Sequence, residues 1–168
     1  MSGRERAVFG PAAPGDEEQI FSLIRDRIQW MDDHGISQWN YVNYWDLYPE
    51  SYYRTAISEG RLYVLKVPGT GEILSAGVLA ESDSLWGQED LPSVYLHNFV
   101  TDRAAPGSGG IFLAACEELA KSLGKKRFRL DCIKTNLKLN QYYEAHGYQA
   151  VGEIEDGKYV GTKREKVL

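Results

Sequence analysis

The spacing of hydrophobic and polar residues along this chain predicts helices and strands in turn. A first helix begins at Asp16, where Gln19 follows in a capping-box pattern, and ends at Gly35. Its hydrophobic residues recur at offsets of four, four and three and share one face: Ile20, Ile24, Ile28 and Met31. A second helix over 49–60 starts with proline and stops with glycine, as helices commonly do. The aromatic stretch 36–48 between them lacks periodicity and is predicted as a loop.

The rest of the chain has the pattern of strands and two further helices. Strands are predicted at 5–11, 61–67, 72–82, 93–102, 126–132, 148–154 and 158–166, and helices after the glycine-rich turn near 110 and over 136–146. The order βααβββαβαββ predicts an α/β fold (α+β mixed sheet) with a central sheet flanked by helices. Residues 93–132 are expected to form a right-handed crossover that joins two parallel strands.

Composition narrows the class of protein. The chain has 168 residues, 43% of them hydrophobic and 26% charged, so a single domain over 1–168 is expected. A net charge of −5 argues against nucleic-acid binding. No apolar run approaches the ~20 residues that cross a membrane, and no signal core is evident, so we expect a cytoplasmic protein without a membrane partner. Cys116 and Cys132 lack the spacing of metal ligands and are predicted as buried thiols, with no metal site.

A glycine-rich turn is the first candidate for binding chemistry. Residues 105–110 read Ala-Pro-Gly-Ser-Gly-Gly and lie between a predicted strand and a predicted helix. Backbone N–H groups at a helix start, with small residues around them, suit a phosphate or pyrophosphate. Ile111 stands where a Walker loop has lysine, and Phe112 where a dinucleotide fingerprint has glycine or alanine. A tight turn that simply requires glycine is the alternative.

The helix over 136–146 offers a second candidate. Asn136 and Tyr143 are seven residues apart, which puts them on nearly the same helical face, roughly 10 Å apart along the axis. A ligand along the helix could touch both, and the Tyr143 phenol could donate a proton. The alternative is structural, with Asn136 capping the helix and Tyr143 packing on the sheet.

Taken together, these segments resemble the GNAT-type N-acetyltransferase superfamily. The resemblance rests on four segments in the family's order and spacing: YLHNFV, RAAPGSGG, FRLDC and NLKLNQYYEAHGY. HGISQW at 34–39 is similar to a feature of many small bacterial members. In the loop motif, however, Ala105 replaces the basic or amide residue and Ser108 replaces the middle glycine, with Arg103 two positions earlier. This departure leaves a non-catalytic acyl-CoA-binding module of the same fold as the alternative.

The resemblance implies transfer of an acetyl group from acetyl-CoA, as co-substrate, to a primary amine that attacks the thioester directly. Backbone amides would bind the pyrophosphate at Gly107, Ser108, Gly109, Gly110 and Ile111. The strand at Phe99, Val100 and Thr101 would pair with pantetheine, and a strand N–H would polarise the thioester carbonyl. Asn136 would contact the CoA arm, and Tyr143 would protonate the departing thiolate.

The acceptor and the base that deprotonates it are the least defined parts. His97, Glu81 and Asp83 are candidates for the base, with His97 as the chosen catalytic residue. Residues 81–90 carry four acidic side chains and no basic one, which favours an amine acceptor, either a small molecule or a peptide. The crowded aromatics of the predicted loop would hold a cationic amine or, alternatively, complete a core or a homodimer interface: Trp39, Tyr41, Tyr44, Trp45 and Tyr48.

Overall fold

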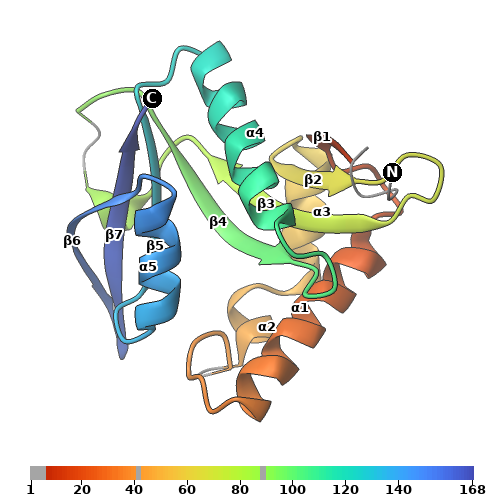
Figure 1. Cartoon of the computed structure of the whole chain (residues 1–168), viewed down its shortest axis with the longest axis horizontal. Helices are drawn as coiled ribbons and strands as arrows, with labels where there is room; N and C mark the ends of the chain where they lie inside the picture. The colour runs from red at the N-terminus through yellow and green to blue at the C-terminus, as the bar shows by residue number, and fades with distance from the viewer. Residues whose placement is uncertain (1–6, 41–42, 88–89) are drawn as a thin grey trace. The chain divides into compact units, whose positions relative to one another are not determined.

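The computed structural model describes residues 7–40, 43–87 and 90–168. The elements are β1 (Val8–Pro11), α1 (Glu17–Asp33), α2 (Tyr44–Leu47), α3 (Glu50–Ser58), β2 (Leu62–Lys66), β3 (Ile73–Ala80), η2 (Ser84–Trp86), β4 (Ser93–Thr101), α4 (Ser108–Ser122), β5 (Arg127–Ile133), α5 (Leu137–Ala145), β6 (Gln149–Asp156) and β7 (Tyr159–Val167) (Figure 1). The strands form one seven-stranded mixed sheet in the order β1-β2-β3-β4-β5-β7-β6. The α/β fold class and the parallel pairing of β4 with β5 are therefore confirmed.

Two local predictions for the N-terminal region were wrong. Gln19 does not complete a capping box: its side chain donates to the Gly71 carbonyl at 2.9 Å and accepts from the Ile73 N–H at 3.0 Å. The Asp16 carboxylate makes an ion pair with Lys66 instead of capping α1. The side chains of Asp16 and Gln19 thus bind the β2–β3 hairpin instead of capping the start of α1. The stretch 36–48 is also not wholly loop, because it contains the short helix α2.

The chain divides into two compact units. Unit 1 consists of Met1–Val78 and Asn98–Leu113, and unit 2 of Leu79–His97 and Ala114–Leu168. In unit 1, α1, α3 and the β1–β3 strands enclose a core that includes Phe21, Tyr53 and Val100. The helical face predicted from hydrophobic spacing is largely buried there, since Ile20 and Ile24 are both nearly inaccessible.

Unit 2 is built on β5, which pairs with β7 in antiparallel register from Arg127↔Val167 to Ile133↔Gly161. Its apolar face carries Phe128, whose ring meets Tyr148 edge-on at 5.8 Å. The Tyr148 hydroxyl donates to Glu117 of α4 at 3.0 Å, so the tyrosine links sheet and helix. Residues of β5 point alternately to this apolar face and to the opposite face, as in any strand.

The two cysteines are buried, as the sequence around them predicts. Cys116 and Cys132 are buried free thiols, and burial raises the pKa of Cys132 to about 11.

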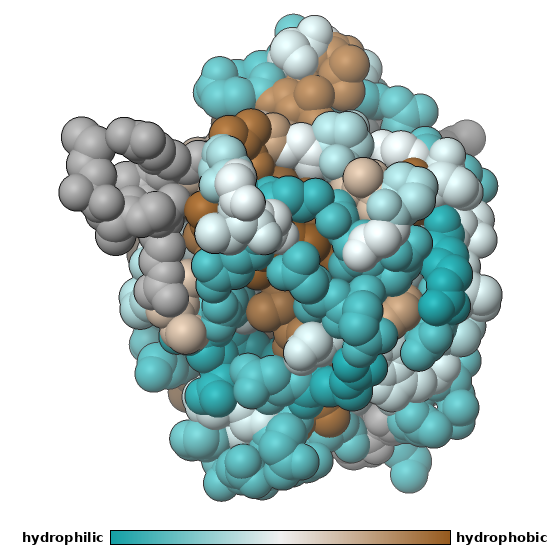
Figure 2. All heavy atoms as spheres, turned by 90° about the vertical axis from the view of Figure 1, so that its right-hand side faces the viewer, coloured by the Kyte–Doolittle hydropathy of each residue, from teal (hydrophilic) through white to brown (hydrophobic). Residues whose placement is uncertain are grey.

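Hydrophilic residues cover most of the face in Figure 2, with hydrophobic residues gathered in smaller areas. Within the described residues, every helix is too short or too polar to cross a membrane.

Candidate active site

The parallel pair β4–β5 separates soon after it starts. The paired residues run only from Ser93↔Arg127 to Tyr95↔Arg129. Both strands continue, β4 to Thr101 and β5 to Ile133. Beyond Arg129, the recorded pairing of β5 is with β7 alone.

Helix α5 covers the apolar face of β5 in unit 2 (Figure 1). The thiol of Cys132 in β5 donates to Oδ1 of Asn140 in α5 at 3.3 Å, which fixes the helix against the strand. Tyr143 lies on the same helix, is 7% exposed, and packs edge-on to Tyr148 with ring centroids 6.0 Å apart. Burial raises the pKa of Tyr143 above its ordinary value, and Cys132 contributes in the same direction. This tyrosine therefore stays a neutral hydroxyl donor.

Asn136, the first of the two residues predicted to touch a ligand along α5, has a structural role. Oδ1 of Asn136 accepts the N–H of Leu139 at 3.1 Å, so Asn136 is the N-cap of α5. A contact from Asn136 to the CoA arm stays a prediction. Tyr142, next to Tyr143, is half-buried and packs against His146 with ring centroids 4.3 Å apart, which turns it to a different side of the helix.

The opposite face of the pair carries a polar cluster that includes His97. Nε2 of His97 lies 3.4 Å from Oδ2 of Asp83, whose Oδ1 accepts the N–H of Leu85 at 2.9 Å. A ring nitrogen of His97 and a carboxylate oxygen of each of Asp83 and Asp131 all lie within 4.8 Å of one another. Asp131 in turn accepts the hydroxyl proton of Tyr159 at 2.6 Å. Two carboxylates thus flank one imidazole.

Asp131 was not among the predicted site residues. Burial raises the pKa of its carboxyl, against the opposing effects of the Tyr159 hydrogen bond and of His97. The alternation in FRLDC does place Asp131 on the face away from Cys132. Its proximity to His97 depends on the β4–β5 pairing, which sequence spacing alone does not align.

Two of the acidic side chains in residues 81–90 form ion pairs within unit 2. Glu81 pairs with Lys125 at 3.4 Å, and Asp90 with Arg129 at 3.2 Å. Glu89 lies outside the described residues. Of the three described acidic residues in this stretch, Asp83 is the one that lies at the polar cluster, together with Asp131. Glu81, a candidate base, is largely exposed and bound to lysine rather than placed at the polar cluster.

The glycine-rich turn leads into α4 in unit 1. Gly107 has φ +87°, a left-handed conformation that favours glycine. The Ile111 N–H already bonds the Gly107 carbonyl at 3.3 Å, whereas the N–H groups of Gly109 and Gly110 have no recorded partner in the described chain. These two donors and the helix dipole suit an anion.

The two departures from the family loop are accommodated by burial. Ala105 is 3% exposed, so a long basic side chain has no room there. Ser108 is 4% exposed and its hydroxyl donates to the Leu74 carbonyl at 3.3 Å, which turns the side chain away from the helix start. Arg103 pairs with Asp26 of α1 at 3.1 Å and is occupied there.

The predicted pantetheine strand lies in the second half of β4. Phe99 stacks on Phe112 of α4 with ring centroids 5.3 Å apart. Val100 belongs to the core of unit 1, and Thr101 accepts two hydrogen bonds from Arg27, through its carbonyl at 3.2 Å and its hydroxyl at 3.1 Å. Side-chain contacts therefore hold each of the three residues, which leaves their backbone direction well defined.

The aromatic residues of 36–48 mainly complete the unit 1 core. Tyr44 is 4% exposed, and Trp39, Trp45 and Tyr48 are partly buried against the same core. Tyr41 lies outside the described residues. The core alternative for these side chains is thus supported by the described contacts.

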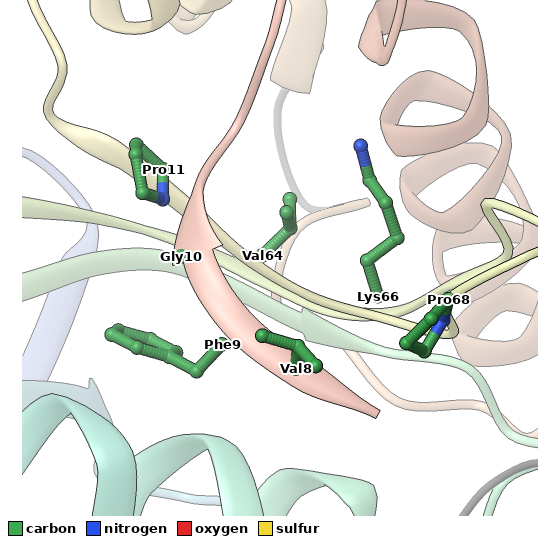
Figure 3. A pocket seen from close by; sticks show the side chains of 7 residues that line it. All are labelled: Val8, Phe9, Gly10, Pro11, Val64, Lys66 and Pro68. Atoms are coloured by element: carbon green, nitrogen blue, oxygen red, sulfur yellow. The ribbon is translucent and has the colours of Figure 1, made fainter. Parts of the chain in front are cut away.

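A separate hollow along β1 has little chemistry to offer. It is lined by Val8, Phe9, Gly10, Pro11, Val64, Lys66 and Pro68. In Figure 3, Phe9 and Lys66 point to opposite sides of β1. The amino group of Lys66 is bound to Asp16 at 2.7 Å, so the lining presents no unengaged titratable side chain. The polar cluster of unit 2 is the better candidate for catalysis.

Comparison with known proteins shows what this chain is similar to. No protein-family model matches the chain. The chain is 29% identical over 163 residues to the uncharacterized N-acetyltransferase YesJ of Bacillus subtilis (strain 168), covering 91% of the chain and 87% of that protein. An acetyltransferase of the GNAT family from Listeria monocytogenes 4b F2365 has a TM-score of 0.76 at 25% identity, over 96% of this chain and 95% of that one. The chain is thus similar in sequence and in fold to GNAT-type N-acetyltransferases.

Further solved structures share the GNAT fold at lower identity. The PaiA N-acetyltransferase from Thermoplasma acidophilum, solved in complex with coenzyme A, gives a TM-score of 0.75 at 15% identity, over 96% of this chain and 99% of that one. The family and the enzyme class predicted from the four sequence segments are thus confirmed. The roles of individual residues in this chain stay predictions.

Proposed function

We propose that the protein transfers an acetyl group from acetyl-CoA to a primary amine by direct attack on the thioester. The observation that carries this proposal is the early separation of β4 from β5, with Tyr143 on one face of the pair and His97 between two carboxylates on the other. A proton donor and a proton acceptor on opposite faces suit a reaction in which the amine arrives from one side and the thiolate leaves on the other.

Acetyl-CoA, when bound, supplies an activated acyl carbonyl and a thiolate leaving group. The N–H groups at the start of α4 would hold its pyrophosphate, with Ser108 turned inward and out of the way. The backbone of Phe99, Val100 and Thr101 would pair with pantetheine like an added strand, and one strand N–H would polarise the carbonyl. Binding by backbone donors explains how the loop tolerates its two departures from the family motif.

His97 would take the proton that the amine loses. The Asp83 carboxylate at 3.4 Å would orient the imidazole, and the Asp131 carboxyl group lies nearby. Within the described ranges neither carboxyl group forms an ion pair with lysine or arginine, which would favour the approach of an ammonium group.

Tyr143 would return a proton to the thiolate. Its neutral hydroxyl is available at physiological pH because burial raises its pKa. Burial disfavours the tyrosinate as well as the thiolate, so the proton would move to sulfur as the C–S bond breaks, and Tyr143 would then recover a proton from solvent.

We further propose that residues 1–168 form a single domain and that the protein is cytoplasmic. The amine that it acetylates would belong to a small molecule or to a peptide.

The direct test is release of free CoA thiol from acetyl-CoA in the presence of a panel of amines. The panel should contain polyamines, amino sugars, amino acids, and peptides with a free N-terminus or lysine. Amine-dependent thiol release, with the acetylated amine seen by mass spectrometry, is the expected result. Tight acetyl-CoA binding without turnover on any amine would instead identify a non-catalytic acyl-CoA-binding module.

A further inference from the structure

Asn98 in β4 has a backbone conformation that is costly in a strand. Its φ is +54°, and it is the one non-glycine residue with positive φ among the described residues. Asparagine tolerates this left-handed region better than most residues, but it does not prefer it to the extended one. Something in the surroundings must therefore hold Asn98 in this conformation.

Two tyrosines bind both ends of the Asn98 side chain. The hydroxyl of Tyr52 in α3 donates to Oδ1 at 2.8 Å. Nδ2 donates to the hydroxyl of Tyr44 in α2, also at 2.8 Å, and Tyr44 is hydrogen-bonded to Tyr53 of α3. All four side chains belong to unit 1. Burial raises the pKa of Tyr52 to about 12 and raises that of Tyr44 as well, so both phenols remain neutral over the working pH range.

The side-chain alternation of β4 changes phase at this residue. Before Asn98, the odd-numbered Tyr95 and His97 contact Arg129 and Asp83. After it, the odd-numbered Phe99 stacks on Phe112 of α4, while the even-numbered Val100 enters the unit 1 core. A one-residue change of phase is what a β-bulge produces, and it redirects the backbone N–H groups that follow.

We propose that Tyr44 and Tyr52 are positioning residues that hold Asn98 in its left-handed conformation and thereby aim the backbone of Phe99–Thr101. The inference rests on the proposed function, because it is this backbone that we assign to pantetheine and to the thioester carbonyl. The tyrosines touch neither substrate in this account and act only through Asn98. A displacement of about 1 Å at a reacting centre is enough to cost ~10²-fold in rate.

Three single variants test the clamp, with a matched control. Asn98→Ala removes the carboxamide and disfavours positive φ, so kcat should fall about 100-fold. Asn98→Gly also removes the carboxamide but accepts positive φ, so it should recover most of that loss. Tyr52→Phe should lower kcat about 10-fold with little change in the Kd of acetyl-CoA. Tyr63→Phe, which removes a hydroxyl from unit 1 on β2, should match wild type.

The double variant Asn98→Gly/Tyr52→Phe separates positioning from general structural support. If Tyr52 acts through Asn98, the double variant has the same kcat as Asn98→Gly alone, because the interaction has already been removed. Amide NMR shifts of Phe99 and Val100 give a readout that needs no turnover. They should move in Tyr52→Phe and stay unchanged in Tyr63→Phe.

The outcomes distinguish this inference from the proposed function. If wild type acetylates no amine, the proposed function fails, and the amide shifts then decide the clamp. Multiplying losses in the double variant, equal activity of Asn98→Ala and Asn98→Gly, or unchanged amide shifts in Tyr52→Phe would each overturn the positioning role. Coinciding single and double variants with shifted amides would establish it.

Discussion

On the helix face of the β4–β5 pair, Tyr143 is buried beside Tyr148, and burial has the largest effect on its pKa. On the other face, His97 is half-exposed between the carboxylates of Asp83 and Asp131. The first environment favours a neutral hydroxyl, and the second places two carboxyl groups beside an imidazole. The two faces of one strand pair thus place the proposed acid, on α5, and the proposed base, on β4, in different surroundings.

The difference shows why the two groups need separate surroundings. If Tyr143 stood among carboxylates it would be solvated and hydrogen-bonded, and if His97 stood in the apolar face its charged form would be penalised by desolvation. The alternation of β5 achieves the separation with adjacent residues, since Cys132 faces α5 and Asp131 faces His97. Each face can be altered by substitution while the other is left intact.

The largest effect is expected from removing the acid of the helix face. Tyr143→Phe keeps the ring and its packing, so the fold should be retained, but kcat should fall ~10²-fold or more because the thiolate loses its proton donor. Acetyl-CoA affinity should change much less, since the hydroxyl acts as charge develops on sulfur. Steady-state thiol release measures this, with Tyr142→Phe as the control. Equal losses in both variants would refute the special role of Tyr143.

Removal of the base on the polar face should be nearly as damaging. His97→Gln should lower kcat/KM for the amine by ~10²-fold at neutral pH, because no side chain then accepts the amine proton. His34→Gln is the matched control, since His34 stacks on Trp30 in unit 1 and is outside the cluster. A His97→Gln enzyme as active as this control would leave water as the proton acceptor.

A charge at the start of α4 should weaken binding without touching either face. Gly110→Asp places a carboxylate where a first-turn acid suits the helix dipole, so the helix itself should not suffer. It would repel the pyrophosphate, and we expect about a 10-fold weaker Kd for acetyl-CoA. Calorimetry and the acetyl-CoA-dependent rise in Tm measure the effect. Gly110→Asn, neutral and of the same size, is the control, and equal Kd values in the two variants would show that the turn binds no phosphate.

The smallest effect concerns stability and the carboxylate of Asp131. Burial raises its pKa in the folded state, so ionising it destabilises the fold. The folded chain therefore holds this proton more tightly than the unfolded chain, and stability contributed by the protonated form is lost as pH rises through the folded pKa. Asp131→Asn should reduce this loss on going from about pH 4 to pH 7. Urea unfolding across that range checks it, and an unchanged pH slope would contradict the assignment.

Local sequence patterns predicted the elements that form the two faces. Alternation in 126–132 and glycine at helix ends located β5, α4 and α5 close to their true bounds, because short-range hydrophobic spacing decides these elements. The same spacing put Tyr143 on the α5 face. The family resemblance, which adds four motifs in order, then supplied the role that the spacing alone left open.

Contacts between distant segments explain what was missed. The left-handed backbone of Asn98 depends on tyrosines 46 and 54 residues earlier in the chain. The residues next to Asn98 in the sequence do not predict this conformation. Gln19 bonds to the β2–β3 hairpin more than 50 residues away, which overrode a local capping pattern. Asp131 joins His97 only when β4 and β5 pair, and Tyr159 only when β7 adds to β5.

The most direct test of the two-face account is the pH dependence of the two kcat/KM losses for one amine at saturating acetyl-CoA. Between pH 7 and pH 9 a growing share of an ordinary amine is neutral before it binds, since its pKa is ~10. We predict that the loss caused by His97→Gln shrinks markedly over this range, while the loss caused by Tyr143→Phe does not. Two losses that change in parallel with pH would contradict a separate acid and base on the two faces.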